Sequence, residues 1–264
     1  MGTFPKEFLA FPLDLILAAL WLIAVFALWR NGRKSLLVRF MLSSSATVSS
    51  IVLFLALCLV IGLTGNRELA GSWISVFVLL YIQTVLLFVI LRGWRRKTAT
   101  GARVGAIRWR FLIIHAGLLL ALGSAFWGAP DTTSVRMQVE KGIPENVAYD
   151  FDGRQVWLDY EIELKDFSVE TYSDGTPSMY EAMLSVDGKD VQIKVNHPYS
   201  KGFGEDIYLC GYDAESGSET AYCILEVVYE PWKYGAVAGI ILLLLGALLL
   251  FLGGPDRRSV INDD

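Results

Sequence analysis

The sequence predicts a multi-pass α-helical membrane protein with five transmembrane helices and an all-β, sandwich-like extracytoplasmic domain. The chain has 264 residues, of which 54% are hydrophobic, and its mean hydropathy is +0.46. This is too apolar for an ordinary soluble domain. The apolar residues gather in five long runs, and one long polar segment separates the fourth run from the fifth.

Each of the five runs is long enough to cross a hydrocarbon core of about 30 Å as a helix. A helix is expected because a single span in lipid must satisfy its backbone hydrogen bonds internally. The runs cover residues 13–29, 46–64, 73–91, 111–128 and 234–253. They divide the chain into a four-helix transmembrane region (1–128), an extracytoplasmic β domain (129–232), and a closing helix with a cytoplasmic tail (233–264).

Charge orients these spans. The loop at residues 30–45 carries four Lys and Arg residues and the loop at 92–110 carries seven, and neither loop has an acidic residue. The positive-inside rule places both loops in the cytoplasm, which puts the N-terminus and the β domain outside and returns Arg257 and Arg258 to the cytoplasm. The first span lacks a basic leader and a small-residue cleavage site, so we expect an uncleaved anchor.

The polar segment has the sequence pattern of β-strands. Apolar and polar side chains alternate along residues 155–165 and again along 190–195, which is the period of a strand with one buried face. Turn signals rich in Gly, Asp, Ser and Pro separate such runs at residues 172–177, 186–190 and 214–219. About six to eight short strands are expected, arranged as a sandwich or a partly open barrel.

This predicted domain is strongly acidic. From Asp131 to Trp232 there are 21 Asp and Glu residues and 7 Lys and Arg residues, a net charge of −14, whereas the whole chain has −4. Such a charge argues against nucleic acid as a partner and allows a basic protein partner. Solvation of the surface is the more common reason for this composition.

Three cysteines are present. Cys58 lies in the second span, where a free cysteine packs as a small apolar residue. Cys210 and Cys223 flank the turn at 213–219, and a hairpin there would bring them close to cross-strand register. A disulfide is permitted outside the cytoplasm and would stabilise the domain by about 3 kcal/mol. A redox-active pair and a ligand pair are the competing interpretations.

Catalytic motifs are otherwise missing. The sequence contains no phosphate-binding glycine loop, no HExxH and no GxSxG, and two histidines cannot form a complete metal cage. Asp14, at the outer end of the first span, is expected to be interfacial and hydrated. Gln83 in the third span could contact a ligand, but an interhelical packing role is favoured.

His115 is the one polar residue of its span that calls for a special explanation. It lies five residues past Arg110, roughly 7 Å below the cytoplasmic interface, where a polar ring needs a partner. It could bond a neighbouring helix, or it could be an axial ligand of haem. His197 is expected on the other side of the membrane, so a second ligand to the same iron would have to come from another subunit.

The chain resembles the ResB family, also called CcsB, of System II cytochrome c biogenesis. The resemblance covers residues 40–232 and rests on several motifs in the family's order. "FLIIHAGLLLALGSAFWG" is similar to a family span with a His-x-Gly pattern, which His115 and Gly117 match. Two segments of the polar domain are also similar, "DFSVETYSDGTPSMYEAMLSV" and "VNHP", and they contribute the motif residues Tyr172, Gly175, Asn196, His197 and Pro198.

The chain also departs from the family pattern. Members usually have three spans before a larger exterior domain, whereas this chain adds an N-terminal span and has the shorter polar segment at 129–232. It also lacks the tryptophan-rich WWD segment of the CcsA (ResC) partner. By resemblance it is therefore the B subunit alone, a non-catalytic or shared-site subunit of a cytochrome c synthase (haem lyase) in the bacterial plasma membrane.

The resemblance implies that haem enters from the cytoplasmic side and is passed through the bundle to CcsA for attachment to apocytochrome c. His115 would be one axial ligand, and a helix of the CcsA/ResC-type WWD protein would supply the other. The β domain would be a platform for the apocytochrome or for CcsA loops, His197 would be structural, and a thioredoxin-like thiol reductant would be a further partner. Two alternatives stay open: a non-catalytic assembly scaffold whose β domain binds a partner, and a transporter, which the lack of broken spans disfavours.

Overall fold

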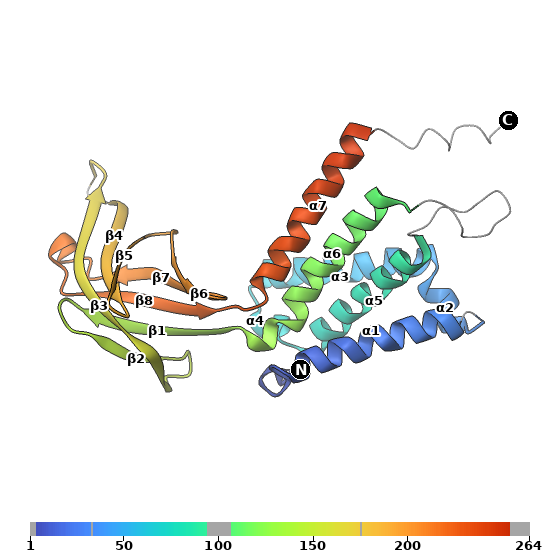
Figure 1. Cartoon of the computed structure of the whole chain (residues 1–264), viewed down its shortest axis with the longest axis horizontal. Helices are drawn as coiled ribbons and strands as arrows, with labels where there is room; N and C mark the ends of the chain where they lie inside the picture. Colours follow the sequence, from blue (N-terminus) through green and yellow to red (C-terminus); the bar gives the residue numbers. More distant parts are fainter. Residues whose placement is uncertain (1–3, 33, 94–106, 175, 254–264) are drawn as a thin grey trace. The chain divides into compact units, whose positions relative to one another are not determined.

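The computed structural model describes residues 4–32, 34–93, 107–174 and 176–253 (Figure 1). It comprises a helical unit, Met1–Pro130 with Trp232–Asp264, and a β unit, Asp131–Pro231. Each unit is described by itself. Most of the predicted basic loop at 92–110, and both Arg257 and Arg258, lie outside the described residues.

The helical unit contains the five predicted spans. Five of its described helices are long and apolar enough to cross a membrane. They are α1 (Leu13–Asn31), α3 (Ser44–Thr64), α5 (Trp73–Gly93), α6 (Trp109–Trp127) and α7 (Lys233–Gly253). Short helices join or precede them: η1 (Lys6–Leu9), α2 (Leu36–Met41) and α4 (Arg67–Ala70). Both ends of each of these five helices agree with the sequence prediction to within two residues, and the chain is a membrane protein.

The ends of α3 illustrate how local sequence sets a helix. The Ser43 hydroxyl accepts a hydrogen bond from the Ala46 N–H at 3.2 Å, which caps the first turn. At the other end Gly65 has φ of 62°, a left-handed conformation that glycine adopts at low cost and that stops the helix.

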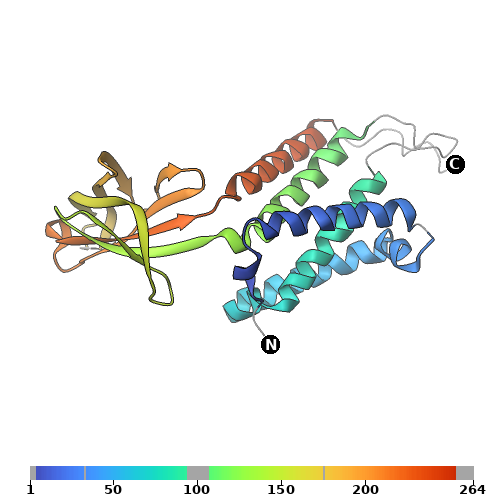
Figure 2. The ribbon, with the colours of Figure 1, turned by 60° about the horizontal axis from the view of Figure 1, so that its bottom comes forward.

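Helix α5 lies between α3 and α6, and α1 packs beside it (Figure 2). Polar bonds join these helices: Trp21 Nε1 of α1 donates to Thr84 Oγ1 at 3.0 Å, and the Ser49 and Tyr81 hydroxyls of α3 and α5 lie 2.9 Å apart. The expectation for Asp14 was wrong. It is buried in the first turn of α1, where a carboxylate complements the positive end of the helix dipole, instead of facing water.

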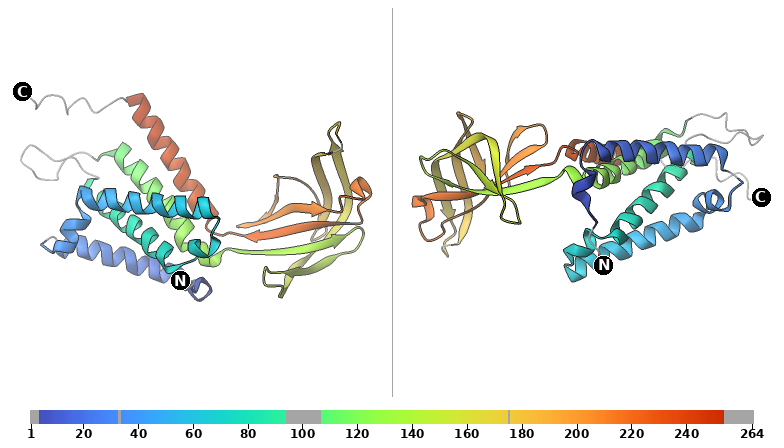
Figure 3. Two further views of the ribbon diagram at one scale, coloured as in Figure 1. Left: turned by 180° about the vertical axis from the view of Figure 1, so that it is seen from behind. Right: turned by 90° about the horizontal axis from the view of Figure 1, so that it is seen from below.

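The β unit is one eight-stranded antiparallel sheet. Its strands are β1 (Thr133–Glu140), β2 (Glu145–Tyr149), β3 (Gln155–Thr171), β4 (Pro177–Val186), β5 (Lys189–Lys194), β6 (Tyr199–Gly202), β7 (Glu205–Tyr212) and β8 (Tyr222–Tyr229). Short 3-10 turns lie before β1 (η2, Ala129–Asp131) and before β8 (η3, Gly217–Glu219). The strand order is β5-β4-β3-β2-β1-β8-β7-β6, so the first and last strands in sequence pair in the interior of the sheet (Figure 3).

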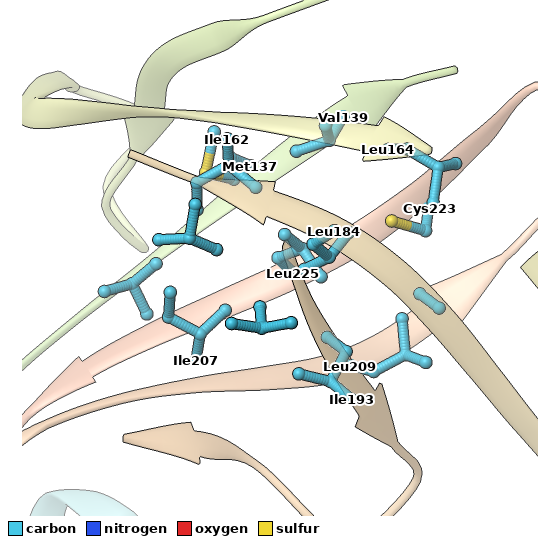
Figure 4. Packing of buried hydrophobic residues seen from close by; sticks show 14 of the residues in the cluster. Met137, Val139, Ile162, Leu164, Leu184, Ile193, Ile207, Leu209, Cys223 and Leu225 are labelled. Atoms are coloured by element: carbon cyan, nitrogen blue, oxygen red, sulfur yellow. The ribbon is translucent and has the colours of Figure 1, made fainter. Parts of the chain in front are cut away.

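The sheet curls around a single apolar core. Ile193 of β5, near one end of the sheet, and Ile207 of β7, near the other, belong to the same buried cluster as Leu225 of β8 (Figure 4). The interior therefore has the two facing halves of a sandwich, while the unbroken strand order is that of a partly open barrel. Of the expected inward residues of β3, Tyr160, Ile162 and Leu164 are buried and Val156 and Leu158 are half-buried.

The predicted turns join these strands. Between β4 and β5, Asp187 has φ of 53° and Gly188 has φ of 73°, and Val186 pairs with Lys189 on either side. Two consecutive positive φ values make a type I′ turn, which suits the twist of a two-residue hairpin.

Candidate functional site

His115 is held in a fixed orientation near the start of α6. Its ring is half-buried, and its Nδ1 lies 2.8 Å from the Phe111 carbonyl oxygen one turn earlier. A carbonyl only accepts, so Nδ1 carries the hydrogen and Nε2 keeps its lone pair in the neutral ring. Among the described residues, none bonds Nε2. A ring held through one nitrogen with the other free is the usual arrangement of a histidine that binds a metal.

The Phe111 side chain packs against one face of the His115 ring. The two rings are stacked, with centroids 4.0 Å apart and planes 29° apart. The Arg108 guanidinium carbon lies 4.8 Å from the Phe111 centroid, and Gly93 of α5 leaves the space for that ring, because a Cβ there would lie 2.5 Å from Phe111 Cζ. Arg108, Phe111 and His115 thus form a column that leads from the basic end of α6 into the span.

Gly117 lies on the opposite side of α6 and brings α6 and α7 together. A Cβ at Gly117 would lie 2.8 Å from the Gly239 carbonyl oxygen, and a Cβ at Gly239 would lie 2.5 Å from the Ala121 nitrogen. Gly235 and Gly239 of α7 have the Gly-xxx-Gly spacing that allows close approach of membrane helices. The His-x-Gly pattern therefore turns one residue toward α7 and the other away from it.

Gln83 is fully buried in α5, and neither atom of its amide has a hydrogen-bond partner in the described part of the chain. Its burial fits the favoured packing role, although its amide makes no hydrogen bond across helices in the described part of the chain. Gln83 lies beside Gly123 of α6, where a Cβ would be 3.8 Å from Gln83 Oε1.

The "VNHP" motif forms a turn at the end of β5. The His197 N–H donates to the Lys194 carbonyl at 2.9 Å, and Asn196 has φ of 62°, which asparagine tolerates better than most residues. The His197 side chain is exposed and Pro198 is half-buried. Tyr172 is also exposed, after the end of β3, and Gly175 lies outside the described residues.

Cys210 and Cys223 are both free, so the structure contains no disulfide between them. The cross-strand partner of Cys223 is Tyr212, and Cys210 lies at a register shift between Leu209 and Gly211, so the two cysteines are not cross-strand partners. Cys223 points into the core, and burial raises its pKa to about 12. Cys210 lies on the outer face, where partial burial and then the Glu226 carboxylate, 3.7 Å from its sulfur, raise its pKa.

Sequence reasoning singled out His115 but missed the residues that orient it. The signal was present, since Phe111 is four residues earlier and its carbonyl faces the same side of the helix. Gly93 could not have been found, because its role depends on how α5 meets α6. In the described ranges no three His, Cys, Asp or Glu side chains converge to hold a metal ion.

These features define a class of protein: a helical membrane protein with a β domain between its last two spans and one histidine within its spans. A ResB-like family profile matches residues 89–226, just over half of the chain. The chain belongs to the ResB-like family.

Two known proteins are similar to parts of the chain. The cytochrome c biogenesis protein CcsB of Prochlorococcus marinus (strain MIT 9312) is 30% identical over 129 residues, which is 45% of this chain and 29% of that protein. The chain thus spans less than a third of this relative. The solved structure of the cytochrome c heme lyase CcmF aligns with 75% of this chain and 33% of its own, at 15% identity and a TM-score of 0.39.

Proposed function

We propose that this chain is the ResB-type subunit of a cytochrome c biogenesis system. With a CcsA/ResC-type membrane partner it carries haem across the bacterial plasma membrane and supports covalent attachment of haem to apocytochrome c. Membership of the ResB-like family and the similarity to a CcsB protein support this role. In this proposal the N-terminus and the β unit are extracytoplasmic and the C-terminus is cytoplasmic.

The observation that carries the proposal is the geometry of His115. Haem supplies an iron that takes two axial ligands, and an imidazole with a free Nε2 fits one of them. The residues around His115 suit haem as cargo: the apolar Phe111 ring stacks on the imidazole, and the exposed cations Arg92 and Arg108 lie at the same end of the spans for the two propionates. The second ligand comes from a helix of the partner.

The chain's own contribution is to bind and to orient. The Phe111 carbonyl keeps the hydrogen on Nδ1, and the stacked Phe111 ring limits rotation of the imidazole. The β unit is a platform for the apocytochrome, whose thiols a thioredoxin-like reductant keeps reduced. No catalytic residue is assigned to this chain.

The test is an absorption spectrum of the complex with its CcsA-type partner. We expect a haem band in the wild type, loss of most of it in His115→Ala, and partial recovery when imidazole is added to that variant. His197→Ala is the matched control. The His197 ring is exposed and has no ligand role in this proposal, so its removal should leave the band unchanged. A colourless wild-type complex, or a His115→Ala variant with normal spectrum and normal holocytochrome yield, would overturn the proposal. The second result would favour a scaffold whose histidine only packs.

A further inference from the structure

The β unit carries a groove between β1 and β2, on the face of the sheet that points away from the core. Its volume is about 310 Å³. Side chains of both strands and of the turn between them line it: Gln138, Glu140, Ile143, Glu145, Val147 and Tyr149. We call this feature the β1–β2 groove.

The groove exists because β1 and β2 separate as they approach their turn. β1 pairs with β8 at all eight of its residues, but within the described chain it pairs with β2 only at Arg136 and Tyr149. Beyond β1, the Gly142 N–H donates to the Leu164 carbonyl of β3 at 2.9 Å. The Glu140 carbonyl accepts a hydrogen bond from the Ile143 N–H at 3.3 Å, so the side of β1 that faces the groove is a short open edge between Arg136 and that carbonyl.

Glu145 stabilises this opening from within the hairpin. Its Oε1 accepts hydrogen bonds from the backbone N–H groups of Asn146 at 3.1 Å and Val147 at 3.0 Å. Because buried backbone donors must be satisfied, this carboxylate lets β2 stay apart from β1 without a strand partner. The groove is thus a built feature of the fold.

Large apolar side chains surround the groove. Val147 is the cross-strand partner of Trp157, which is 68% exposed. Ile143 and Tyr149 are also exposed, and Phe151, just past β2, is 70% exposed. Exposed aromatic side chains gathered at a groove are typical of surfaces that bind another polypeptide.

The negative charge of the groove favours a positively charged polypeptide as its ligand. Glu140 and Glu145 line it, whereas the cations at its two ends are already paired, Arg136 with Glu226 at 3.0 Å and Lys141 with Asp166 at 2.9 Å. The surrounding unit has a net charge of −14. A lysine or arginine side chain fits both properties, because its aliphatic stem can lie on apolar groups while its cation meets a carboxylate.

We propose that the β1–β2 groove binds an extended polypeptide segment that carries lysine or arginine side chains. Its main chain adds to the open edge of β1, as in β-strand addition, and its cations meet Glu140 and Glu145. This inference rests on the proposed function in one respect, which is that the segment belongs to the unfolded apocytochrome.

The experiment uses the full-length protein in lipid nanodiscs and a fluorescein-labelled hexapeptide of alternating lysine and valine. Fluorescence anisotropy at low salt should show saturable binding, and a glutamate–valine peptide should not bind. We expect Glu140→Gln to weaken binding roughly fivefold and Glu140→Lys to weaken it further. Glu170→Lys is the matched control, because it makes the same charge change at another exposed position, on β3, and should leave binding unchanged.

Three results would overturn the inference: no saturable binding of the lysine–valine peptide, equal binding of the glutamate–valine peptide, or equal effects of Glu140→Lys and Glu170→Lys. The last would mean a diffuse response to the acidic surface. Since Glu140 is exposed, Glu140→Gln keeps the test valid if the charge reversal disturbs folding. His115→Ala separates the two proposals, because it should abolish the haem band and leave peptide binding intact.

Discussion

The β unit buries mainly apolar side chains, whereas the helical unit buries polar side chains alongside apolar ones. The interior of the β unit consists of bulky apolar residues such as Ile162, Leu184 and Leu225, as expected where water drives apolar groups inward. In the helical unit most large apolar side chains of α3 and α7 are exposed, and Ser50, Gln83 and Ser124 are among the buried residues. Lipid does not drive apolar side chains inward, so its helices associate through close backbone contact and polar bonds.

The largest expected effect tests whether α6 and α7 depend on close backbone contact, and it comes from one methyl group added where the two helices meet. We expect Gly117→Ala to lower the free energy of unfolding by about 2 kcal/mol, because the new Cβ would collide with main-chain and Cβ atoms of α7 that cannot rotate away. Thermal unfolding in detergent micelles, followed by the helical circular-dichroism signal, measures it.

Gly62→Ala in α3 is the matched control for this prediction. A Cβ at Gly62 meets nothing within 4 Å, so the substitution should cost no stability. Equal melting temperatures for the two variants would show that α6 and α7 do not depend on close backbone approach.

In the β unit the polar side chains lie mostly on the outer face of the sheet, where they are paired with one another. The contribution of such a pair to stability can be tested at Glu226. Glu226 of β8 accepts hydrogen bonds from the Ser134 hydroxyl at 2.6 Å and from Arg136 Nε at 3.0 Å. Glu226→Gln should cost about 1 kcal/mol at neutral pH. Denaturant unfolding of the β unit within the full chain measures this, with Glu161→Gln, an exposed carboxylate of β3, as the control.

The same pair predicts a pH dependence. The hydrogen bond from Ser134, followed by those from Arg136, lowers the pKa of Glu226 below its usual range. A carboxylate with a lowered pKa stabilises the fold above its unfolded pKa, and the contribution is lost as the pH falls through the folded value. The difference between wild type and Glu226→Gln should therefore shrink below about pH 4.5. A difference that grows in acid would contradict this assignment.

The spans and the alternation of the strands could be predicted because each follows from a local period and a uniform solvent. Lipid demands about 20 apolar residues and a sheet with one wet face demands every second residue, so residues 73–91 and 155–165 were identified from the sequence alone. The prediction that Asp14 faces water was wrong because the burial of this residue depends on neighbours that are distant in the sequence.

The site could be predicted only in part. An imidazole inside an apolar run singles out His115, but the role of Gly93 depends on how two helices meet. The β1–β2 groove was not predictable either, because residues 138–149 carry an ordinary hairpin pattern. The separation of the strands depends on the Glu145 carboxylate and on a register shift between β2 and β3.

Substitution of Cys210 gives the smallest expected effect. Cys210 is exposed on the outer face and forms no disulfide, and a serine hydroxyl can keep its hydrogen bond to Glu226, so Cys210→Ser should change the free energy of unfolding by less than about 0.5 kcal/mol. A disulfide to Cys223 would instead make the loss about 3 kcal/mol and would make it vanish in reductant. Cys223→Ser should cost about 1–3 kcal/mol with or without reductant, because it buries a hydroxyl in the core. Equal, reductant-sensitive losses for both variants would show that a disulfide joins Cys210 and Cys223. That result would contradict the placement of the two cysteines on opposite faces of the sheet.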